Sequence, residues 1–374
     1  MAGNPLKRTP LHEWHVQLGA RMTDYVGWDM PLLYRGIQEE HRHTREACSV
    51  FDVSHMGRLD VRGDGAGAFL ELLCTRRLGD MEPGRMRYSH VCHERGGVLD
   101  DVLVARHETH WSVVCNACNR PKIVAWLRRH AEGREVAIDD ITESTAMMAV
   151  QGPRTMDEAA RRIPLPLADL PRYGFRSGEY FGMRYVVSRT GYTGEDGFEV
   201  ILPTQAAVMG WQFLLQADDE FAPAVILPAG LGARDTLRIE AGMPLYGHEL
   251  REGIDPLTAG FAWCVDLEKD FVGADAIRAV RNAGPTRRRV GLSLAGRRIA
   301  RQGCEVLHNG RVVGEITSGT ISPTLDRSIA MAYLACELAT IGTSLRVRIR
   351  NHEEEAVVVE LPFYRRKQRG TQAT

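Results

Sequence analysis

The sequence lacks the hydrophobic segments that insert into or cross a membrane. No apolar run in the 374 residues approaches the roughly 18 residues of a membrane span. The N-terminal stretch MAGNPLKRTPLHEWH has no hydrophobic core of a secretory signal, so we expect a cytoplasmic location. An excess of charge is also absent, because 47 basic residues face 48 acidic ones. Nothing therefore draws the chain as a whole to nucleic acid or an anionic membrane, and any electrostatic partner must bind locally.

Common catalytic and metal-binding signatures are missing as well. The chain has no G-x-S-x-G elbow, H-E-x-x-H, Walker loop, or G-x-G-x-x-G that opens a helix after a strand, which disfavours the matching hydrolase, protease and nucleotide-binding classes. The eight cysteines are irregularly spaced, so we expect reduced thiols. Cys115 and Cys118 form one C-x-x-C, a spacing seen in redox pairs and in half of a zinc site. No second pair follows at metal spacing, and we expect no metal.

The length and composition of the chain predict a folded protein with more than one domain. A chain of 374 residues is too long for one ordinary core, so two or three domains are expected. Its residues are 44% hydrophobic and 25% charged, which is typical of a folded, soluble protein because disordered chains are poorer in apolar residues.

Hydrophobic periodicity predicts mixed α+β segments followed by a β-rich one. Helical patterns lie at 9–18, 37–47, 64–74, 121–130, 205–216 and 229–242. Alternating strand patterns lie at 51–63, 98–107, 111–115, 146–152, 184–189 and 197–202. From residue 284, short strands separated by Gly, Pro, Asn and Ser predict a small β-sandwich or barrel.

The stretch GGVLDDVLV at 96–104 places two aspartates side by side in a predicted strand. Neighbouring side chains of a strand point to opposite faces, so Asp100 and Asp101 cannot both point at water if one face is covered. One of these carboxylates should therefore face something other than solvent. It is a candidate for binding a group with hydrogen-bond donors.

The stretch GYTGEDGFEV at 191–200 combines three glycines with three carboxylates. Glycine permits a sharp turn or a close approach to a ligand, and a hairpin turn with acidic tips is the favoured interpretation of Glu195 and Asp196. Glu199 differs because apolar residues flank it in a strand whose faces alternate. We predict that it is a second buried acid.

Two further places are open to a structural or a functional interpretation. Arg234 and Arg238 lie four apart on one face of a predicted helix, with acidic residues nearby. An arginine fork there can bind an internal acid or an acidic ligand, and we favour an internal ion pair. His55 in DVSHM is a candidate base, but a single histidine near a strand start is more often structural.

Further motifs occur in order along the chain, among them RTPLHEWHVQLGARM, VGWDMPLLY, FDVSHMG, RYSHVC, VVCNACN, AVQGP, PAGLGARDTLRIEAG and VGEITSGTISPTL. Together with the two stretches above they resemble the glycine cleavage system T-protein family of tetrahydrofolate-dependent aminomethyltransferases, from about residue 8 to 365. The resemblance implies an α+β fold, a three-domain cloverleaf around a central folate cavity. The implied domains are a discontinuous folate-binding domain at 1–51 and 142–275, an inserted ferredoxin-like α+β domain at 52–141 that carries the catalytic residue, and a C-terminal antiparallel β-barrel or jelly-roll-like domain at 276–374.

The same resemblance implies the site residues. The catalytic aspartate of the family matches Asp101, and a family glutamate at the pterin matches Glu199. The other cofactor-binding positions match Arg234, Tyr88, Asn116, Met56, Tyr192 and Trp263. Because relatives carry the asparagine without its flanking cysteines, the match to Asn116 lowers the metal interpretation of CNAC further.

The activity implied is transfer of a methylene from an aminomethyl group, carried on the lipoylated H-protein, to the co-substrate tetrahydrofolate. The partners would be H-protein and folate, with no nucleic acid or membrane. The basic runs at 287–289 and 365–367 could receive the carrier or the folate glutamate tail. Two alternatives remain, a folate-dependent demethylase of another small amine or thioether and a non-catalytic folate-binding regulatory relative. The second is expected to lose the acid at 101 or the GEDGFE strand, and both are present.

Overall fold

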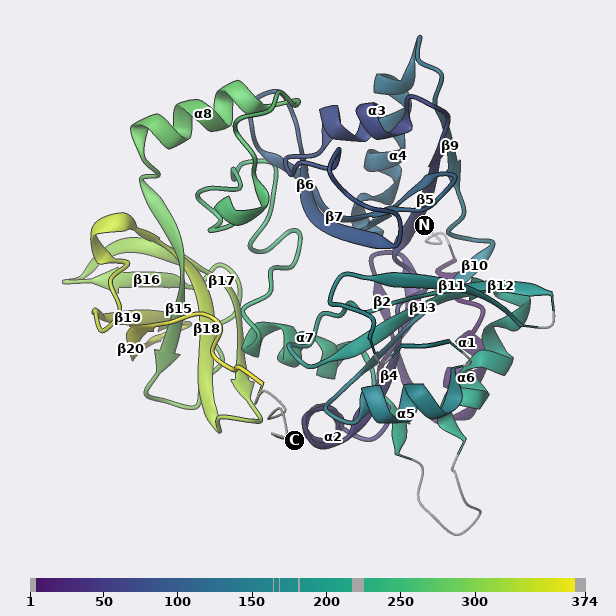
Figure 1. Cartoon of the computed structure of the whole chain (residues 1–374). Coiled ribbons are helices and arrows are strands. Elements are labelled where there is room, and N and C mark those ends of the chain that lie inside the picture. The colour runs from purple at the N-terminus through teal and green to yellow at the C-terminus, as the bar shows by residue number, and fades with distance from the viewer. Residues whose placement is uncertain (1–4, 164, 168, 181, 217–224, 367–374) are drawn as a thin grey trace, which may run out of the picture.

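The protein has three lobes arranged around a central region (Figure 1). The structure is a computed structural model that describes residues 5–163, 165–167, 169–180, 182–216 and 225–366. None of the helices in these ranges is long and apolar enough to cross a membrane.

The first lobe is built on a six-stranded sheet in the order β11-β12-β13-β10-β4-β14. Its strands are β4 (Cys48–Asp52), β10 (Thr145–Gln151), β11 (Phe175–Tyr180), β12 (Met183–Ser188), β13 (Gly197–Pro203) and β14 (Ile226–Pro228). A small sheet of β1 (Lys7–Arg8), β2 (Arg21–Tyr25) and β3 (Trp28–Leu33) accompanies it. The helices are α1 (His12–Gln17), α2 (Ile37–Glu46), α5 (Thr155–Arg162), α6 (Ala207–Leu215) and α7 (Leu231–Glu240). Because β4 and β10 are neighbours, the chain leaves this sheet after residue 52 and returns at 145.

The segment between those two strands forms the second lobe. Its five-stranded sheet has the order β6-β7-β8-β5-β9. The elements are β5 (Gly57–Arg62), α3 (Ala66–Leu73), β6 (Arg85–Cys92), β7 (Val98–Arg106), β8 (Trp111–Cys115), α4 (Arg120–Ala131) and β9 (Ala137–Asp140). Without the edge strand β6, this is a ferredoxin-like β-α-β-β-α-β unit with both helices packed on one core.

The third lobe is a closed barrel of antiparallel strands in the order β15-β18-β17-β16-β19-β20. The strands are β15 (Arg287–Leu294), β16 (Glu305–His308), β17 (Arg311–Ser322), β18 (Arg327–Ala335), β19 (Ser344–Ile349) and β20 (His352–Val359). Helix α8 (Ala274–Ala283) and the short helix η3 (Ala262–Cys264) lie on the segment that leads into it. The predicted α+β class with a C-terminal β-barrel is confirmed.

Two local predictions from periodicity were wrong. The predicted strand at 51–63 is interrupted after Asp52 by a turn, and β5 begins only at Gly57. The first helix begins at His12 rather than at Thr9 as predicted, because the Thr9 hydroxyl donates to Asp52 Oδ2 at 2.6 Å and so serves a long-range contact. No pattern that we recognised predicted helices α5 and α8 or strands β1, β2, β3, β6, β9, β11 and β14.

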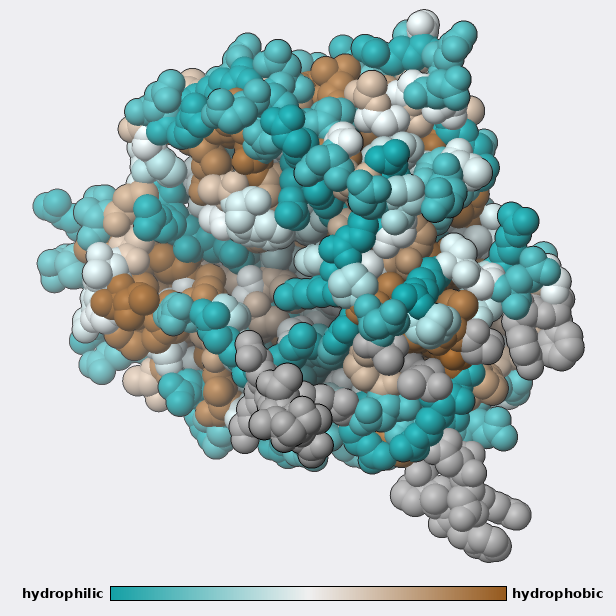
Figure 2. Space-filling view, viewed as in Figure 1, coloured by the Kyte–Doolittle hydropathy of each residue, from teal (hydrophilic) through white to brown (hydrophobic). Residues whose placement is uncertain are grey.

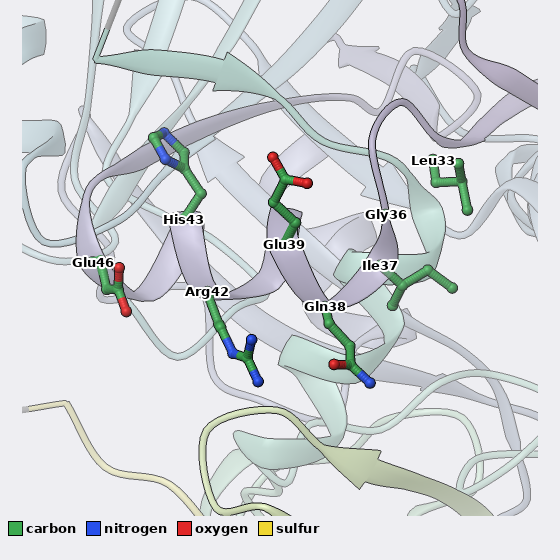
Figure 3. Close-up of a pocket in the computed structure, with 8 residues that line it drawn as sticks. All are labelled: Leu33, Gly36, Ile37, Gln38, Glu39, Arg42, His43 and Glu46. Atoms are coloured by element: carbon green, nitrogen blue, oxygen red, sulfur yellow. The ribbon is translucent and has the colours of Figure 1, made fainter.

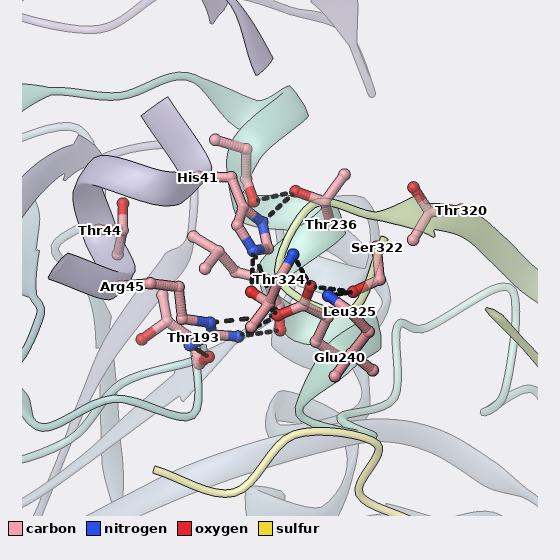
Figure 4. Close-up of polar contacts among 12 residues, drawn as sticks. His41, Thr44, Arg45, Thr193, Thr236, Glu240, Thr320, Ser322, Thr324 and Leu325 are labelled. Atoms are coloured by element: carbon pink, nitrogen blue, oxygen red, sulfur yellow. Dashed lines mark hydrogen bonds and ion pairs between the residues drawn. The ribbon is translucent and has the colours of Figure 1, made fainter. Parts of the chain in front are cut away.

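A buried polar network joins the first lobe to the barrel (Figure 4). At its centre, Glu240 of α7 accepts hydrogen bonds from Arg45 of α2 at 2.9 and 3.1 Å. The same carboxylate accepts from the hydroxyl groups of Ser322 and Thr324, at the β17–β18 turn. Arg45 also donates to Glu195 at 2.8 Å. We call these residues, with His41, the seam network; in it every buried charge has an opposite charge beside it.

Candidate functional site

A cavity of about 880 Å³ lies between the three lobes. Figure 2 shows the molecule hollowed near the centre of the face in view. The walls come from the β4–β5 turn, from β6 and β7, from the β12–β13 turn and β13, and from α7 and η3. A volume in this range suits a ligand of the size of an organic cofactor.

The two adjacent aspartates of β7 point in opposite directions, and neither faces bulk water. Asp100 shares its strand face with Val102 and Val104, whose side chains pack in the core beneath α3 and α4. Its Oδ2 accepts the backbone N–H of Asn116 at 2.9 Å, and its Oδ1 accepts the side-chain amides of Asn116 and Asn119 at 2.9 and 2.6 Å. Burial and the neighbouring charge of Asp101 raise the pKa of Asp100 to about 8, against the pull of these three donors. Asp100 therefore anchors the start of α4 and is not open to a ligand.

Asp101 faces the cavity from the other side of the strand. Its Oδ2 accepts the hydroxyl of Tyr88 at 2.9 Å, and its Oδ1 accepts the Asn116 side-chain amide at 2.7 Å. Burial raises the pKa of the Asp101 carboxyl, while these two donors oppose the rise. A carboxylate oriented by two donors, with its pKa raised by burial, is suited to stabilise positive charge and to exchange a proton.

The opposite wall carries the second predicted acid. Glu199 of β13 is 6% exposed and accepts a short hydrogen bond from the Thr190 hydroxyl. Burial raises its pKa, and the Thr190 hydrogen bond and the charge of Arg234 lower it. The adjoining turn comes very close to the sheet, because a Cβ atom on Gly191 would lie 1.9 Å from Gln151 Oε1. The glycines of this turn are thus required by close packing, and the predicted hairpin with acidic tips is confirmed.

The two arginines of α7 differ, although they are one turn apart. Arg238 is 1% exposed and binds Glu249 at 3.0 Å and Asp235 at 2.9 Å, so the internal ion pair that we favoured is right for this residue. It is wrong for Arg234: within the described residues this side chain has no ion pair, and its buried Nη1 has no hydrogen-bond partner. The Arg234 guanidinium instead lies 4.8 Å from the centre of the Tyr192 ring and borders the cavity. A buried donor without a partner is costly, which suggests that a ligand supplies the acceptor.

His55 is a buried histidine whose Nδ1 has no hydrogen-bond partner in the described part of the chain. It lies in the β4–β5 turn, borders the cavity, and meets the Tyr25 ring edge-on with ring centres 5.4 Å apart. Burial lowers its pKa to about 3, so the imidazole is neutral at physiological pH.

All eight residues that the sequence proposed for the site border this one cavity. They are Met56 in the β4–β5 turn, Tyr88 in β6, Asp101 in β7, Asn116 after β8, Tyr192 in the β12–β13 turn, Glu199 in β13, Arg234 in α7 and Trp263 in η3. Their individual roles stay predictions. Sequence reasoning missed Asn119, which donates to Asp100, and Thr190, which donates to Glu199. The repeated Asn of CNACN was the only signal for the first, and nothing marked the second.

The C-x-x-C motif does not assemble a site of its own. Cys115 is fully buried within β8, whereas Cys118 is exposed in the turn before α4. Burial raises the pKa of the Cys115 thiol, and partial desolvation with the charge of Asp100 raises that of Cys118 to about 11, so neither is a reactive thiolate. The described residues contain no group of three or more metal-ligating side chains.

The basic run at 287–289 is not simply a solvated surface. The Arg289 guanidinium donates to the backbone carbonyls of Ala259 at 2.9 Å and Gly242 at 2.8 Å and is therefore a structural link between the barrel and the first lobe. In the second run, Arg365 and Arg366 bind Glu360 and Asp196. Lys367 lies outside the described residues.

A second hollow follows the outer side of α2 (Figure 3). Its charged lining residues Glu39, Arg42 and Glu46 are exposed and extend from a single helix. It lacks buried polar groups that converge from several elements, and the central cavity is the better candidate.

Comparison with known proteins gives a consistent result. Residues 11–269 match the GCVT N-terminal domain family, and residues 287–365 match the glycine cleavage T-protein C-terminal barrel domain. The chain is 43% identical to an aminomethyltransferase of Symbiobacterium thermophilum, with 96% of this chain and 98% of that protein covered. It is 45% identical to an aminomethyltransferase of Rubrobacter xylanophilus, with 98% and 96% covered. The crystal structure of the glycine cleavage system aminomethyltransferase T from Bartonella henselae superposes with a TM-score of 0.91 at 34% identity, with 97% and 99% covered.

Proposed function

Since the chain belongs to the glycine cleavage T-protein family of folate-dependent aminomethyltransferases, we propose that its central cavity binds tetrahydrofolate and that Asp101 promotes methylene transfer to it. The aminomethyl donor would be the lipoylated H-protein. The single observation that carries this proposal is the direction of Asp101, a carboxylate held by two donors at the wall of a cavity that Arg234 and His55 also border.

The chemistry of the cavity walls fits a reduced folate. A pterin presents a 2-amino group next to a ring N–H, and a carboxylate such as that of Glu199 accepts both at once. The unpartnered Nη1 of Arg234 and Nδ1 of His55 offer a donor and a neutral ring nitrogen to the polar edge of the same ligand. Trp263, which is 56% exposed, is stacked on Tyr88 with ring centres 5.6 Å apart and supplies an apolar surface beside Asp101.

The reaction converts an aminomethyl sulfide, R–S–CH2–NH3+, and tetrahydrofolate into 5,10-methylenetetrahydrofolate, R–SH and NH4+. The migrating carbon loses its bonds to sulfur and nitrogen and gains bonds to N5 and N10. The two protons leaving N5 and N10 are those that the sulfur and the ammonia take up. Asp101 stabilises the positive charge that develops on the carbon, because a fixed anion in a partly dry site does so better than water. It also accepts a proton from the folate amine and returns it to the departing group.

The sheet memberships support the division expected from the family: 1–51 with 142–275, 52–141, and 276–374. We propose these as the domain boundaries.

The proposed activity also favours a cytoplasmic enzyme that meets its carrier protein in solution. If the exposed basic side chains Arg287 and Arg288 receive an acidic carrier, added salt should weaken the association with H-protein.

The test is to mix the purified protein with aminomethylated H-protein, with and without tetrahydrofolate, and to measure ammonia and methylenetetrahydrofolate. We expect both products to form together and to depend on folate. The demethylase alternative would be favoured if the protein transferred no carbon from H-protein but released formaldehyde, or formed methylenetetrahydrofolate, from a free methylamine or thioether. Folate binding without turnover would favour the regulatory one.

A further inference from the structure

Directly across the sheet from Asp101 lies a histidine that the proposed reaction does not use. His90 of β6 pairs in register with Asp101 of β7, and Tyr88 is two residues away on the same strand. Cross-strand partners and residues two apart share one face of a sheet, so all three side chains lie on the same side. His90 is fully buried and does not border the cavity, whereas Tyr88 and Asp101 do.

The hydrogen bonds among these side chains are donated from His90 to Tyr88 and from Tyr88 to Asp101. The Tyr88 hydroxyl lies 2.9 Å from Asp101 Oδ2 and 3.2 Å from His90 Nε2. The hydroxyl has one hydrogen, and an ionised carboxylate can only accept, so that hydrogen belongs to the bond with Asp101. The Tyr88 oxygen must then accept from His90, which fixes the imidazole proton on Nε2. The Cys264 thiol lies 3.7 Å from His90 Nδ1, where it meets the ring nitrogen left as an acceptor.

The surroundings keep the histidine neutral and hold its ring in place. Phe261 meets the ring nearly at a right angle with ring centres 5.3 Å apart, and the Tyr88 ring meets it at 76°. Burial, and then the charge of Arg289, lower the pKa of His90 to about 3. A neutral imidazole has one N–H, and every contact described here assigns it to Tyr88.

We propose that His90 is a positioning residue for the transfer reaction: its Nε2–H holds the Tyr88 hydroxyl as a donor to Asp101 and so keeps that carboxylate ionised and aimed into the cavity. This inference rests on the proposed function, because it assigns the support of the catalytic carboxylate. His90 acts through Tyr88 and touches neither substrate.

Replacing His90 removes that support without removing a cavity wall. In His90→Phe the ring volume is kept but the donor is lost, so Tyr88 turns more freely and Asp101 loses part of a charge-assisted hydrogen bond. We expect kcat to fall about tenfold with the KM for tetrahydrofolate within about twofold. The pKa of Asp101 rises when a donor to it weakens, so the acid limb of the kcat profile should move to higher pH.

Other groups act on the same carboxylate and must stay constant across the comparison. The titratable groups whose charges interact with Asp101 or His90 are Asp100 from β7, Cys118 after β8, Tyr192 from the β12–β13 turn, Cys264 from η3 and Arg289 from β15. None of them is changed by the His90 variants.

The decisive comparison uses two amides of different length. The side-chain amide of His90→Gln reaches the position of Nε2 and should restore most of the rate, whereas that of His90→Asn reaches only the position of Nδ1 and should be as slow as His90→Phe. In a Tyr88→Phe background the loss from His90→Phe should vanish, because the residue acts through that hydroxyl. His130→Phe on α4 is the matched control, with kcat unchanged.

The possible results distinguish a failure of this proposal from a failure of the proposed function. Equal rates in the Gln and Asn variants, a loss that persists in the Tyr88→Phe background, or wild-type kcat and pH profile in His90→Phe would each overturn the proposal. The Gln and Asn pair decides the matter even if His90→Phe does not fold. An inactive wild-type protein would instead overturn the proposed function, on which this inference rests.

Discussion

The seam network and the central cavity both bury charged side chains, but they treat them in opposite ways. In the seam network, Glu240 has Arg45, His41 and two hydroxyl groups around it, and its side chain is fully buried. In the cavity, Arg234 approaches from the same helix α7 with a buried nitrogen that no described residue accepts. One helix thus contributes to both kinds of environment.

Whether a buried charge has a partner distinguishes the structural charges of this protein from the functional ones. A buried charge that is fully paired stabilises one arrangement of the lobes, and removing one partner leaves the other uncompensated. A buried polar group without a partner costs free energy in the absence of ligand and regains it when a ligand binds. Seam variants should therefore change stability and leave folate binding intact, and cavity variants should do the reverse.

The largest effect on stability is expected for Glu240→Gln. The substitution removes the one carboxylate that contacts both Arg45 and His41 and leaves Arg45 with Glu195 alone, and we expect the free energy of unfolding to fall by about 3 kcal/mol. Denaturant titration measures this, with Glu360→Gln as the control because the Glu360–Arg365 pair is exposed and contributes little. Tetrahydrofolate affinity should not change. A loss of affinity larger than the loss of stability would break the distinction between the two regions.

The same carboxylate gives the seam network a pH dependence. Burial acts to raise the pKa of Glu240, but the hydrogen bond and charge of His41 and the charge of Arg45 outweigh it and bring the pKa to about 2. A pKa that is lower in the folded state than in the unfolded one stabilises the fold above the unfolded value. This contribution is fully present above about pH 4.5 and is lost as the pH falls toward 2. Glu240→Gln should flatten the stability profile in that window, and an unchanged slope would contradict the assignment.

Within the cavity, Glu199→Gln should have the largest effect on binding. The uncharged amide keeps the shape but replaces one acceptor with a donor, so it meets one pterin N–H group unfavourably. We expect the Kd for tetrahydrofolate to rise about 30-fold, with little change in thermal stability. Calorimetric titration measures the Kd. Glu179→Gln, an equivalent change at an exposed position of β11, is the control; the same Kd for both variants would remove Glu199 from the folate site.

The smallest effect on binding is expected for Arg234, and the sharpest contrast is between the two arginines of α7. Arg234→Met should raise the Kd for tetrahydrofolate about tenfold and leave the free energy of unfolding unchanged or slightly higher. Arg238→Met leaves Glu249 buried without its cation and should destabilise the protein by about 3 kcal/mol. Equal destabilisation by the two substitutions would show that Arg234 is structural after all.

Much of this arrangement was predictable from local pattern. The alternation around Asp100 and Asp101 required that one acid avoid solvent, and the flanking residues of Glu199 predicted its burial, because both arguments need only the two-residue period of a strand. The family resemblance added further site residues, such as Tyr88 and Trp263, and the arrangement of the domains around a cavity. Family motifs relate residues that are far apart in the sequence, and local periodicity cannot predict that such residues share one site.

The remaining features depend on contacts between distant parts of the chain. The difference between Arg234 and Arg238 depends on Glu249, which lies beyond the helix, and their spacing alone made them equivalent. The early end of the strand before His55 and the late start of α1 depend on Asp52, which accepts from both Thr9 and His15. Nothing in the sequence singled out His90, because its position opposite Asp101 depends on the pairing of β6 with β7.

Whether Asp101 takes part in the chemistry rather than in binding is decided by single-turnover kinetics of Asp101→Asn at saturating tetrahydrofolate. Asp139→Asn, on β9 of the same sheet and exposed, is the control. We expect the rate of methylenetetrahydrofolate formation from aminomethylated H-protein to fall about 100-fold, with the folate Kd within about threefold of wild type. A near-normal rate in Asp101→Asn would show that Asp101 has no catalytic role.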